Sequence, residues 1–176
     1  VTFPCSFMLV GAMNPCRCGY FGHPTHPCTC TPQDVKRYIS RISGPLLDRI
    51  DIEVELPSIS YDELAATGAT GETSDAIRAR VVRARKFAAA RMSGEPGIFC
   101  NAQLDAAGIR KYCIADDAAG AMLRAAYDRM GLSARGYDRI MRVARTIADL
   151  AGSDLIRAEH IAEAIQLRSL DRKYWN

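Results

Sequence analysis

The chain has 176 residues and a mass of 19.3 kDa, which is enough for one ordinary domain or two small ones. Its composition, 48% hydrophobic and 24% charged with a mean hydropathy of -0.09, is typical of a globular protein and excludes collagen-like, mucin-like and largely disordered chains. The longest apolar stretch, residues 7–13, is far shorter than the roughly 20 residues that span a bilayer. We therefore expect no membrane helix.

Charge is distributed unequally along the chain. The formal net charge of +3 is too small to indicate a nucleic-acid partner by itself. Residues 1–74 carry five basic and eight acidic side chains, whereas residues 75–176 carry 18 and 12. Most of the cations are arginines, whose guanidinium suits bidentate contacts to phosphate. The chain starts at Val1, without the charged region of a signal peptide, and enters a predicted strand midway, so we expect a fragment of a longer protein.

The first part of the chain predicts strands around a cysteine-rich loop. Residues 3–13 form a short apolar run that predicts a buried strand ending at Asn14. Residues 14–32 are too rich in Gly, Pro, Cys and His for a regular helix or a central strand. A helix is predicted over 32–42 with Thr31 as its N-cap, and apolar residues alternate with acidic ones over 50–56, which predicts a half-exposed strand.

The second part of the chain reads as helical. Residues 59–74 contain few large apolar groups, so we interpret them as a linker between a first region, 1–58, and a second region, 75–176. Helical spacing of apolar residues predicts helices over 75–92, 116–130, 134–151 and 157–167. Ser133 is the expected N-cap of the third of these helices, and Gly131 the expected end of the second. The second region is therefore predicted to be a small helical bundle.

Four cysteines in the loop form two Cys-x-Cys pairs: Cys16, Cys18, Cys28 and Cys30. Two such arms joined by a turn can supply the tetrahedral shell of sulfur that zinc prefers, and this stretch lacks secondary structure that could order it otherwise. Two disulfides or four free thiols are the alternatives, and His23 and His26 could also replace a ligand. We expect structural zinc without metal catalysis, because four thiolates leave no open coordination position. The remaining cysteines, Cys5, Cys100 and Cys113, are expected to be buried thiols.

Two polar residues of the first region stand where a phosphate could be contacted. Arg49 lies at a junction between a loop and the second predicted strand, from which it could reach a neighbour's phosphate; alternatively, it forms a surface salt bridge with Asp48 or Asp51. Asn14 follows the first predicted strand, where it could orient a water or a phosphate oxygen, or simply start a turn before Pro15.

Arg135 is the second residue of the helix capped by Ser133. A cation in the first turn opposes the helix dipole by about 0.3 to 1 kcal/mol, whereas a bound phosphate would be favoured there. Arg139 and Arg142 continue the same polar face, where they could be solvated surface residues beside Asp138.

These stretches closely resemble the ComM/YifB magnesium-chelatase-like AAA+ ATPases. The resemblance rests on FMLVGAMNPCRCG (7–19), RYISRISGPLLDRID (37–51), LSARGYDRI (132–140) and on residues 3–4, 143–150, 164–166 and 170–172. It implies an α/β plus α fold, in which the C-terminal part of an AAA+ P-loop NTPase core, with an incomplete sheet and the zinc loop, is followed by an all-helical lid. It also implies an ATPase that forms a homo-oligomeric ring, expected to be a hexamer, in the cytoplasm.

The resemblance gives each singled-out residue a role. Asn14 is similar to sensor 1, which positions the attacking water; Arg49 is similar to the arginine finger that reaches the ATP of the next subunit; and Arg135 is similar to sensor 2 of the lid. The family also carries a cysteine-rich insertion at the position of the quartet. No G-x-x-x-x-G-K-[ST] occurs in the chain, and the acidic strand end that would hold Mg²⁺ is missing too. ATP and Mg²⁺ are therefore expected to be bound mainly by residues upstream, and this fragment alone should not hydrolyse ATP.

The sequence is compatible with three functions. The resemblance to ComM implies remodelling of DNA, with branch migration during recombination of incoming DNA. A magnesium-chelatase subunit that drives Mg²⁺ insertion into a porphyrin is the second, although the Cys-x-Cys pairs argue against it. The third is a zinc-containing nucleic-acid-binding module, whose contact helix would carry Arg78, Arg80, Arg83, Arg85 and Lys86, or simply present them to solvent.

Overall fold

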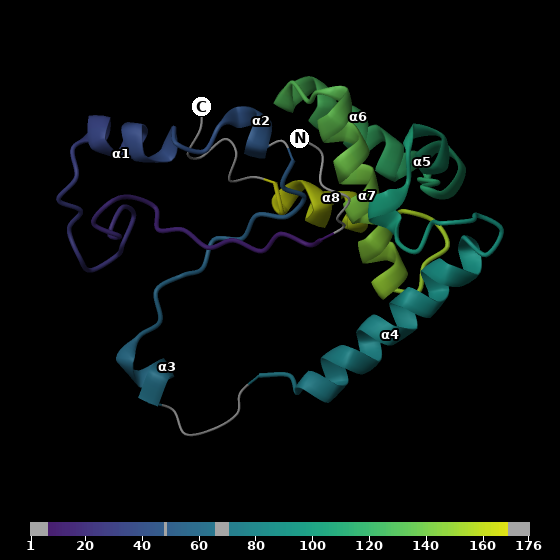
Figure 1. The fold of residues 1–176 in the computed structure, drawn as a ribbon, viewed down its shortest axis with the longest axis horizontal. Helices are drawn as coiled ribbons and strands as arrows, with labels where there is room; N and C mark the ends of the chain where they lie inside the picture. Colours follow the sequence, from purple (N-terminus) through teal and green to yellow (C-terminus); the bar gives the residue numbers. More distant parts are fainter. Residues whose placement is uncertain (1–6, 48, 66–70, 169–176) are drawn as a thin grey trace. The chain divides into compact units, whose positions relative to one another are not determined.

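The computed structural model describes residues 7–47, 49–65 and 71–168 (Figure 1). They fall into two compact units that divide between Ser43 and Gly44. The first unit contains the cysteine-rich loop and one helix, α1 (Pro32–Ile39). The second contains a bundle and two short helices: α2 (Gly44–Leu47), α3 (Tyr61–Ala65), α4 (Ser74–Arg91), η1 (Asn101–Gln103), α5 (Ala106–Tyr112), α6 (Asp117–Met130), α7 (Ala134–Leu150) and α8 (Ala158–Gln166).

Helix α1 begins where the sequence predicts. The hydroxyl of Thr31 accepts a hydrogen bond from the Asp34 amide at 3.2 Å and donates one to the Asp34 carboxylate at 2.7 Å, and Pro32 occupies the first helical position. These hydrogen bonds from Thr31 hold the pKa of Asp34 below its usual value. The helix ends at Ile39 rather than at the predicted Ile42, because its last residues continue as a turn.

Neither predicted strand is present among the described residues, and residues 3–6 of the first one lie outside them. Residues 7–13 are extended but exposed, with Phe7 77% accessible, and Asn14 follows them at the surface rather than at the end of a buried strand. Residues 50–56 are also irregular, and Ile52 and Val54 are exposed. A strand is held by backbone hydrogen bonds to a neighbouring strand, and neither segment finds one among the described residues. The described residues of this part of the chain therefore contain no sheet, and the incomplete sheet of an AAA+ core stays a prediction.

The helical prediction for the second region is confirmed in its main elements. Helices α4, α6, α7 and α8 lie where apolar periodicity places them, with Ser133 capping α7 and Gly131 ending α6 at φ 57°. The 3-10 turn η1 and helices α2, α3 and α5 were not predicted, because segments of three to seven residues are too short for a periodic pattern. None of the helices in the described ranges combines the length and apolar character needed to cross a membrane.

Helix α7 forms the centre of the bundle and packs against α4, η1, α5 and α8 (Figure 1). Its Ile140, Ala144 and Ala148 recur at four-residue intervals and are fully buried. The two alanines allow neighbouring helices to approach closely, and burial of Ile140 alone is worth about 1.5 to 3 kcal/mol. Tyr137 and Ala151, near the two ends of the helix, are exposed.

Candidate functional site

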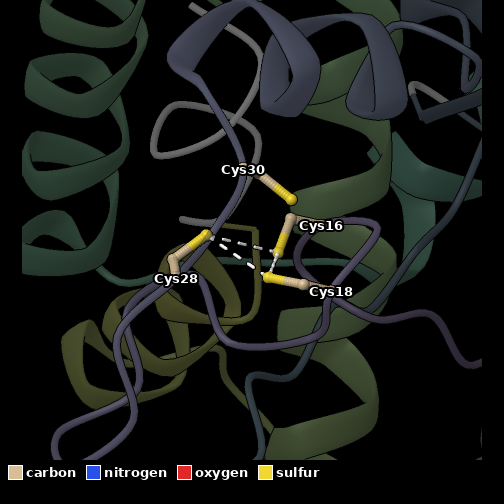
Figure 2. A group of neighbouring side chains, drawn as sticks. All are labelled: Cys16, Cys18, Cys28 and Cys30. Carbon is tan, nitrogen blue, oxygen red and sulfur yellow. Dashed lines mark hydrogen bonds between the residues drawn. The ribbon is translucent and has the colours of Figure 1, made fainter.

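The four cysteines of the quartet converge in the first unit. Figure 2 shows their sulfur atoms turned toward one another, with Cys16 and Cys18 on one arm and Cys28 and Cys30 on the other. The Sγ–Sγ distances are 3.3 Å from Cys16 to Cys18, 3.7 Å from Cys16 to Cys28 and 3.5 Å from Cys18 to Cys28. All four Sγ atoms lie within 4.8 Å of one another. The quartet could therefore hold a metal ion.

The loop reaches this arrangement through two turns that need glycine. The amide of Gly19 donates a hydrogen bond to the Cys16 carbonyl at 3.1 Å, and Gly19 has φ 85°. Gly22 has φ 80° within the next turn, in which the His23 amide bonds to the Tyr20 carbonyl at 3.0 Å. Side chains other than glycine are strained at such angles. The second arm is fixed differently, because Cys30 immediately precedes Thr31, the N-cap of α1.

The sulfur geometry fits a tetrahedral thiolate site, whereas the acidities of the thiols differ. A zinc ion with Zn–S bonds of about 2.3 Å requires Sγ–Sγ edges of about 3.8 Å, close to the three distances above. A hydrogen bond from the Tyr20 backbone lowers the pKa of Cys18 to about 5, against desolvation. The Cys30 backbone also lowers the pKa of Cys28, but desolvation and the neighbouring thiols Cys18 and Cys16 outweigh it and raise that pKa to about 12. A cation at the centre of the quartet would stabilise every thiolate and so offset the repulsion between neighbouring sulfurs.

Two of the alternatives for the quartet, disulfides and histidine ligands, are contradicted by the structure. All six described cysteines are free, so the disulfide alternative is wrong. His23 and His26 are not part of the cluster that could hold a metal. The Nδ1 atom of His23 accepts hydrogen bonds from the amides of Thr25 at 3.2 Å and His26 at 3.1 Å, and the His26 ring stacks on Tyr20 with centroids 5.2 Å apart. The two histidines order the tip of the loop instead.

The remaining cysteines differ from the expectation in one case. Cys113 is buried in the bundle, and desolvation raises its pKa to about 11. Cys100 is exposed, so the prediction of a buried thiol is wrong there. Cys100 immediately precedes η1, and its apolar neighbour Phe99 is exposed as well. Cys5 lies outside the described residues.

Arg49 lies in the second unit, in the irregular segment that replaces the predicted strand. Its side chain is exposed, and Nη1 donates a hydrogen bond to the Pro45 carbonyl one turn earlier. The expected alternative of a salt bridge with Asp51 is wrong, because that carboxylate pairs with Arg139 at 2.6 Å. Asp48, the other proposed partner, lies outside the described residues. The Arg49 side chain is therefore exposed, while other residues hold the backbone of its segment in place.

Two arginines, Arg139 and Arg168, hold this segment. Nη1 of Arg139 donates to the Arg49 carbonyl at 2.6 Å as well as to Asp51, and the Arg139 side chain is only 17% exposed. Nη1 of Arg168 donates to the Ile50 carbonyl at 3.0 Å. The interpretation of Arg139 as a solvated surface residue is therefore wrong. Its acceptors lie about 90 residues away in sequence, so no local pattern could have revealed them.

Arg135 occupies the second position of α7, as predicted, and is exposed. Ser133 caps the helix through a 3.1 Å hydrogen bond from the Gly136 amide to its Oγ. Within the described ranges, the guanidinium of Arg135 has no hydrogen bond or ion pair. Asn14, by contrast, belongs to the first unit, where it is exposed beside the Gly19 turn.

Comparison with known families assigns the chain to a class. Residues 71–168 match the family described as "Magnesium chelatase, subunit ChlI C-terminal", and residues 1–64 match the family described as "Magnesium chelatase, subunit ChlI". The first match alone covers more than half of the chain. The chain therefore belongs to the magnesium-chelatase-like family that includes ComM and YifB.

Individual relatives agree with this assignment. Competence protein ComM of Haemophilus influenzae is 40% identical over 172 residues, which cover 98% of this chain and 32% of the relative. YifB of Escherichia coli is 38% identical over 173 residues, 98% of this chain and 33% of the relative. A protein of Mycobacterium tuberculosis is 38% identical over 168 residues, 94% and 32% of the two chains. The chain spans about a third of the length of these curated relatives.

Proposed function

We propose that this chain is the C-terminal part of a cytoplasmic ATPase that forms a six-membered ring and couples ATP hydrolysis to remodelling of DNA. Branch migration during recombination of incoming DNA is the expected work. Support comes from the family match and from the similarity to a protein named for competence over 98% of the chain. The observation that carries the proposal is Arg135, an exposed cation without a partner among the described residues, in the first turn of a capped helix.

Three side chains would act on the nucleotide between subunits. Arg135 would bind a phosphate, because both its guanidinium and the amides of a helix N-terminus attract anions. Arg49 would neutralise the charge that develops on the transferred phosphoryl group, and arginine fingers in general contribute about 10³ to 10⁵ in rate. Asn14 would orient the attacking water. Support for Arg49 is its exposed side chain on an anchored backbone.

ATP and Mg²⁺ would be held mainly by residues that this chain does not contain. A P-loop supplies the backbone amides and the lysine that bind phosphates, and its sequence pattern does not occur in these 176 residues. The 176-residue chain by itself is therefore expected to lack ATPase activity. Bound zinc would have no catalytic part, because four thiolates fill its coordination shell and only fix the fold of residues 14–32.

Substitution of the two arginines tests the ATPase proposal. In the longer protein that also carries the P-loop, Arg49→Ala should lower ATP turnover about 10³-fold or more, with ATP binding largely intact. Arg135→Ala should lower turnover too. The matched control is Arg124→Ala, which removes an exposed arginine of α6 in the same unit and should leave turnover unchanged. Near-normal turnover of Arg49→Ala would remove this residue from the nucleotide site.

A magnesium-chelatase subunit is the second candidate, and the descriptions of both matching families favour it. Such a subunit would drive Mg²⁺ insertion into a porphyrin. Stimulation of the ATPase by forked DNA, compared with stimulation by a porphyrin and partner subunits, distinguishes the two substrates. Stimulation by the porphyrin alone would replace the DNA proposal.

A zinc-containing nucleic-acid-binding module is the third candidate. The five cations proposed for its contact helix are all exposed on α4, although Arg80 pairs with Glu72 at 2.7 Å. If the module binds nucleic acid through these cations, its affinity for a DNA duplex should fall steeply with salt, because each neutralised phosphate releases counterions. Absence of salt-dependent DNA binding by this chain would exclude the third candidate.

A further inference from the structure

We propose that Arg139 is a positioning residue. Its hydrogen bond to the Arg49 carbonyl attaches the backbone of Arg49 to helix α7, so that Arg49 and Arg135 of one subunit move together. The inference rests on the proposed function for its effect on turnover. The physical attachment itself can be tested without any ATPase activity. Neither the composition nor the spacing of the sequence pointed to this role.

The attachment is made by two short hydrogen bonds from a single guanidinium nitrogen. Nη1 of Arg139 lies 2.6 Å from the Arg49 carbonyl oxygen and 2.6 Å from Oδ1 of Asp51. Exposed ion pairs contribute little, since solvent screens them and the side chains lose entropy. Arg139 is mostly buried, however, and one of its acceptors is backbone, so the contact fixes a position in the chain rather than a surface side chain.

Two further contacts hold the same segment from the end of α8. Arg168, which is 4% exposed, donates to the Ile50 carbonyl at 3.0 Å. The Glu53 amide donates to the Leu167 carbonyl at 2.7 Å. Residues 49–53 form no helix or strand, so these contacts replace the hydrogen bonds that regular structure would supply. The segment is thus attached to α7 at one point and to the residues after α8 at two.

The attachment leaves the Arg49 side chain exposed while its backbone is held. A side chain that must reach a reacting group works best from a rigid base, because a misplacement of about 1 Å can cost about 100-fold in rate. Arg135 lies four residues before Arg139, which is about one helical turn, so both project from neighbouring positions of α7. A shift of α7 when Arg135 gains or loses a phosphate would carry the backbone of Arg49 with it.

Hydrogen exchange of this chain tests the attachment directly. In Arg139→Ala, the hydrogen bonds from the guanidinium to the Arg49 carbonyl and to Asp51 are lost, so residues 49–53 are held less firmly. The Glu53 amide, which donates to the Leu167 carbonyl, should then exchange about tenfold faster or more. Arg139→Lys should restore part of the protection, since an ammonium can still donate to the carbonyl or the carboxylate. Arg124→Ala is the control and should leave the Glu53 amide unchanged. An unchanged rate in a folded Arg139→Ala chain would overturn the inference.

Turnover in the longer protein that carries the P-loop tests the consequence. Arg139→Ala should lower kcat about 10- to 100-fold while KM for ATP changes little, because Arg139 is not expected to touch the nucleotide. Asp51→Ala should have a smaller effect, and the double variant should be no worse than Arg139→Ala alone, since both changes remove one contact. Additive losses of kcat in the double variant would contradict the positioning role. A full kcat in Arg139→Ala, together with faster exchange of the Glu53 amide, would contradict it too.

The outcomes separate this inference from the proposed function. Normal turnover of Arg49→Ala would end the role of Arg49 as an arginine finger, whereas accelerated exchange in Arg139→Ala would still establish the attachment. If Arg49→Ala loses turnover and Arg139→Ala does not, the proposed function stands and the positioning role fails. If Arg139→Ala does not fold, Arg139→Lys carries the same tests, with an intermediate exchange rate and an intermediate kcat expected.

Discussion

Arg91, the last residue of α4, forms a bidentate ion pair with Asp149, near the end of α7. The two guanidinium nitrogens lie 2.6 Å and 2.8 Å from the two carboxylate oxygens, although the residues are 58 positions apart. Asp149 is nearly inaccessible, with a side chain 2% exposed. Such parallel hydrogen bonds are geometrically specific, so the pair fixes how α4 approaches α7.

The same carboxylate serves two other groups. Nδ2 of Asn101 donates to Asp149 at 2.7 Å, and Nε of the fully buried Arg145 donates at 3.0 Å. Arg145 also donates to the carbonyls of Ser153 and Asp154. Burial lowers the pKa of Arg145, and the charge of Asp149 opposes this shift. Asp149 is therefore the acceptor on which several donors of the bundle depend.

Removal of Asp149 should be strongly destabilising. Asp149→Ala would leave the buried guanidinium of Arg145 and that of Arg91 without their counter-ion, and breaking a buried ion pair from one side costs about 3 to 5 kcal/mol. Urea unfolding of this chain, followed by circular dichroism, measures the loss. The control is Glu72→Ala, which removes the exposed pair with Arg80 and should cost less than about 1 kcal/mol. Equal losses would contradict the buried network.

Metal analysis should find one zinc ion per chain. Because the unbound thiol of Cys28 has a pKa of about 12, binding must displace protons, and zinc affinity should fall as the pH falls. Cys28→Ser should lose the metal and the order of residues 14–32, while Cys100→Ser, at an exposed thiol outside the quartet, should keep both. A metal-free chain in which residues 14–32 are still ordered would refute the zinc site.

Cys100 and Cys113 should differ in their reaction with a maleimide at pH 7. The thiolate is the reactive form, and Cys113 is both buried and shifted to a pKa of about 11, so Cys100 should be modified first. Mass spectrometry of the digested protein locates the label. Faster modification of Cys113 would show that this part of the bundle opens in solution.

The raised pKa of Cys113 also predicts a dependence of stability on pH. Below its ordinary pKa of 9.0 the thiol is protonated in both states; between pH 9 and about 11 only the unfolded chain loses the proton. The free energy of unfolding contributed by this group should therefore fall as the pH rises through this window. Urea unfolding of the wild type and Cys113→Ala at pH 8 and 11 should show a smaller decline in the variant. Equal declines would contradict the shift.

Two glycines of the same helix should respond oppositely to substitution by alanine. Gly131 ends α6 with φ 57°, a conformation that strains other side chains, so Gly131→Ala should destabilise the chain by about 1 kcal/mol. Gly120 lies inside α6, is exposed, and an added Cβ would meet nothing within 4 Å. Gly120→Ala should therefore stabilise the chain by about 0.5 to 1 kcal/mol. Thermal unfolding of both variants checks the two signs.

Features that depend on a few neighbouring residues could be predicted from the sequence. Thr31 and Ser133 were identified as N-caps and Gly131 as a helix end, because each forms its hydrogen bond or turn within four residues. The four cysteines were identified as one cluster for a similar reason, since two short arms joined by a turn can fold back on one another. The roles assigned to Asn14, Arg49 and Arg135 stay predictions.

Features that depend on partners distant in the sequence could not be predicted from it. The alternation over 50–56 is a sound strand pattern, but a strand exists only with a neighbouring strand. In this segment the Ile50 carbonyl instead accepts a hydrogen bond from Arg168, and the Glu53 amide donates one to the Leu167 carbonyl. The helical pattern likewise said nothing about Arg145, whose burial at the centre of the bundle requires the carboxylate of Asp149.

The amino-acid sequence by itself thus determined the four main helices of the bundle, the cap at Ser133, the helix end at Gly131 and the clustering of the thiols, since hydrogen bonds and turns between near neighbours need no other part of the fold. Only the tertiary structure decided that Arg139 holds the backbone of Arg49 and that Asp149 joins α4 to α7. These contacts link residues 58 and 90 positions apart, and their energy appears only when packing brings the partners together and excludes water.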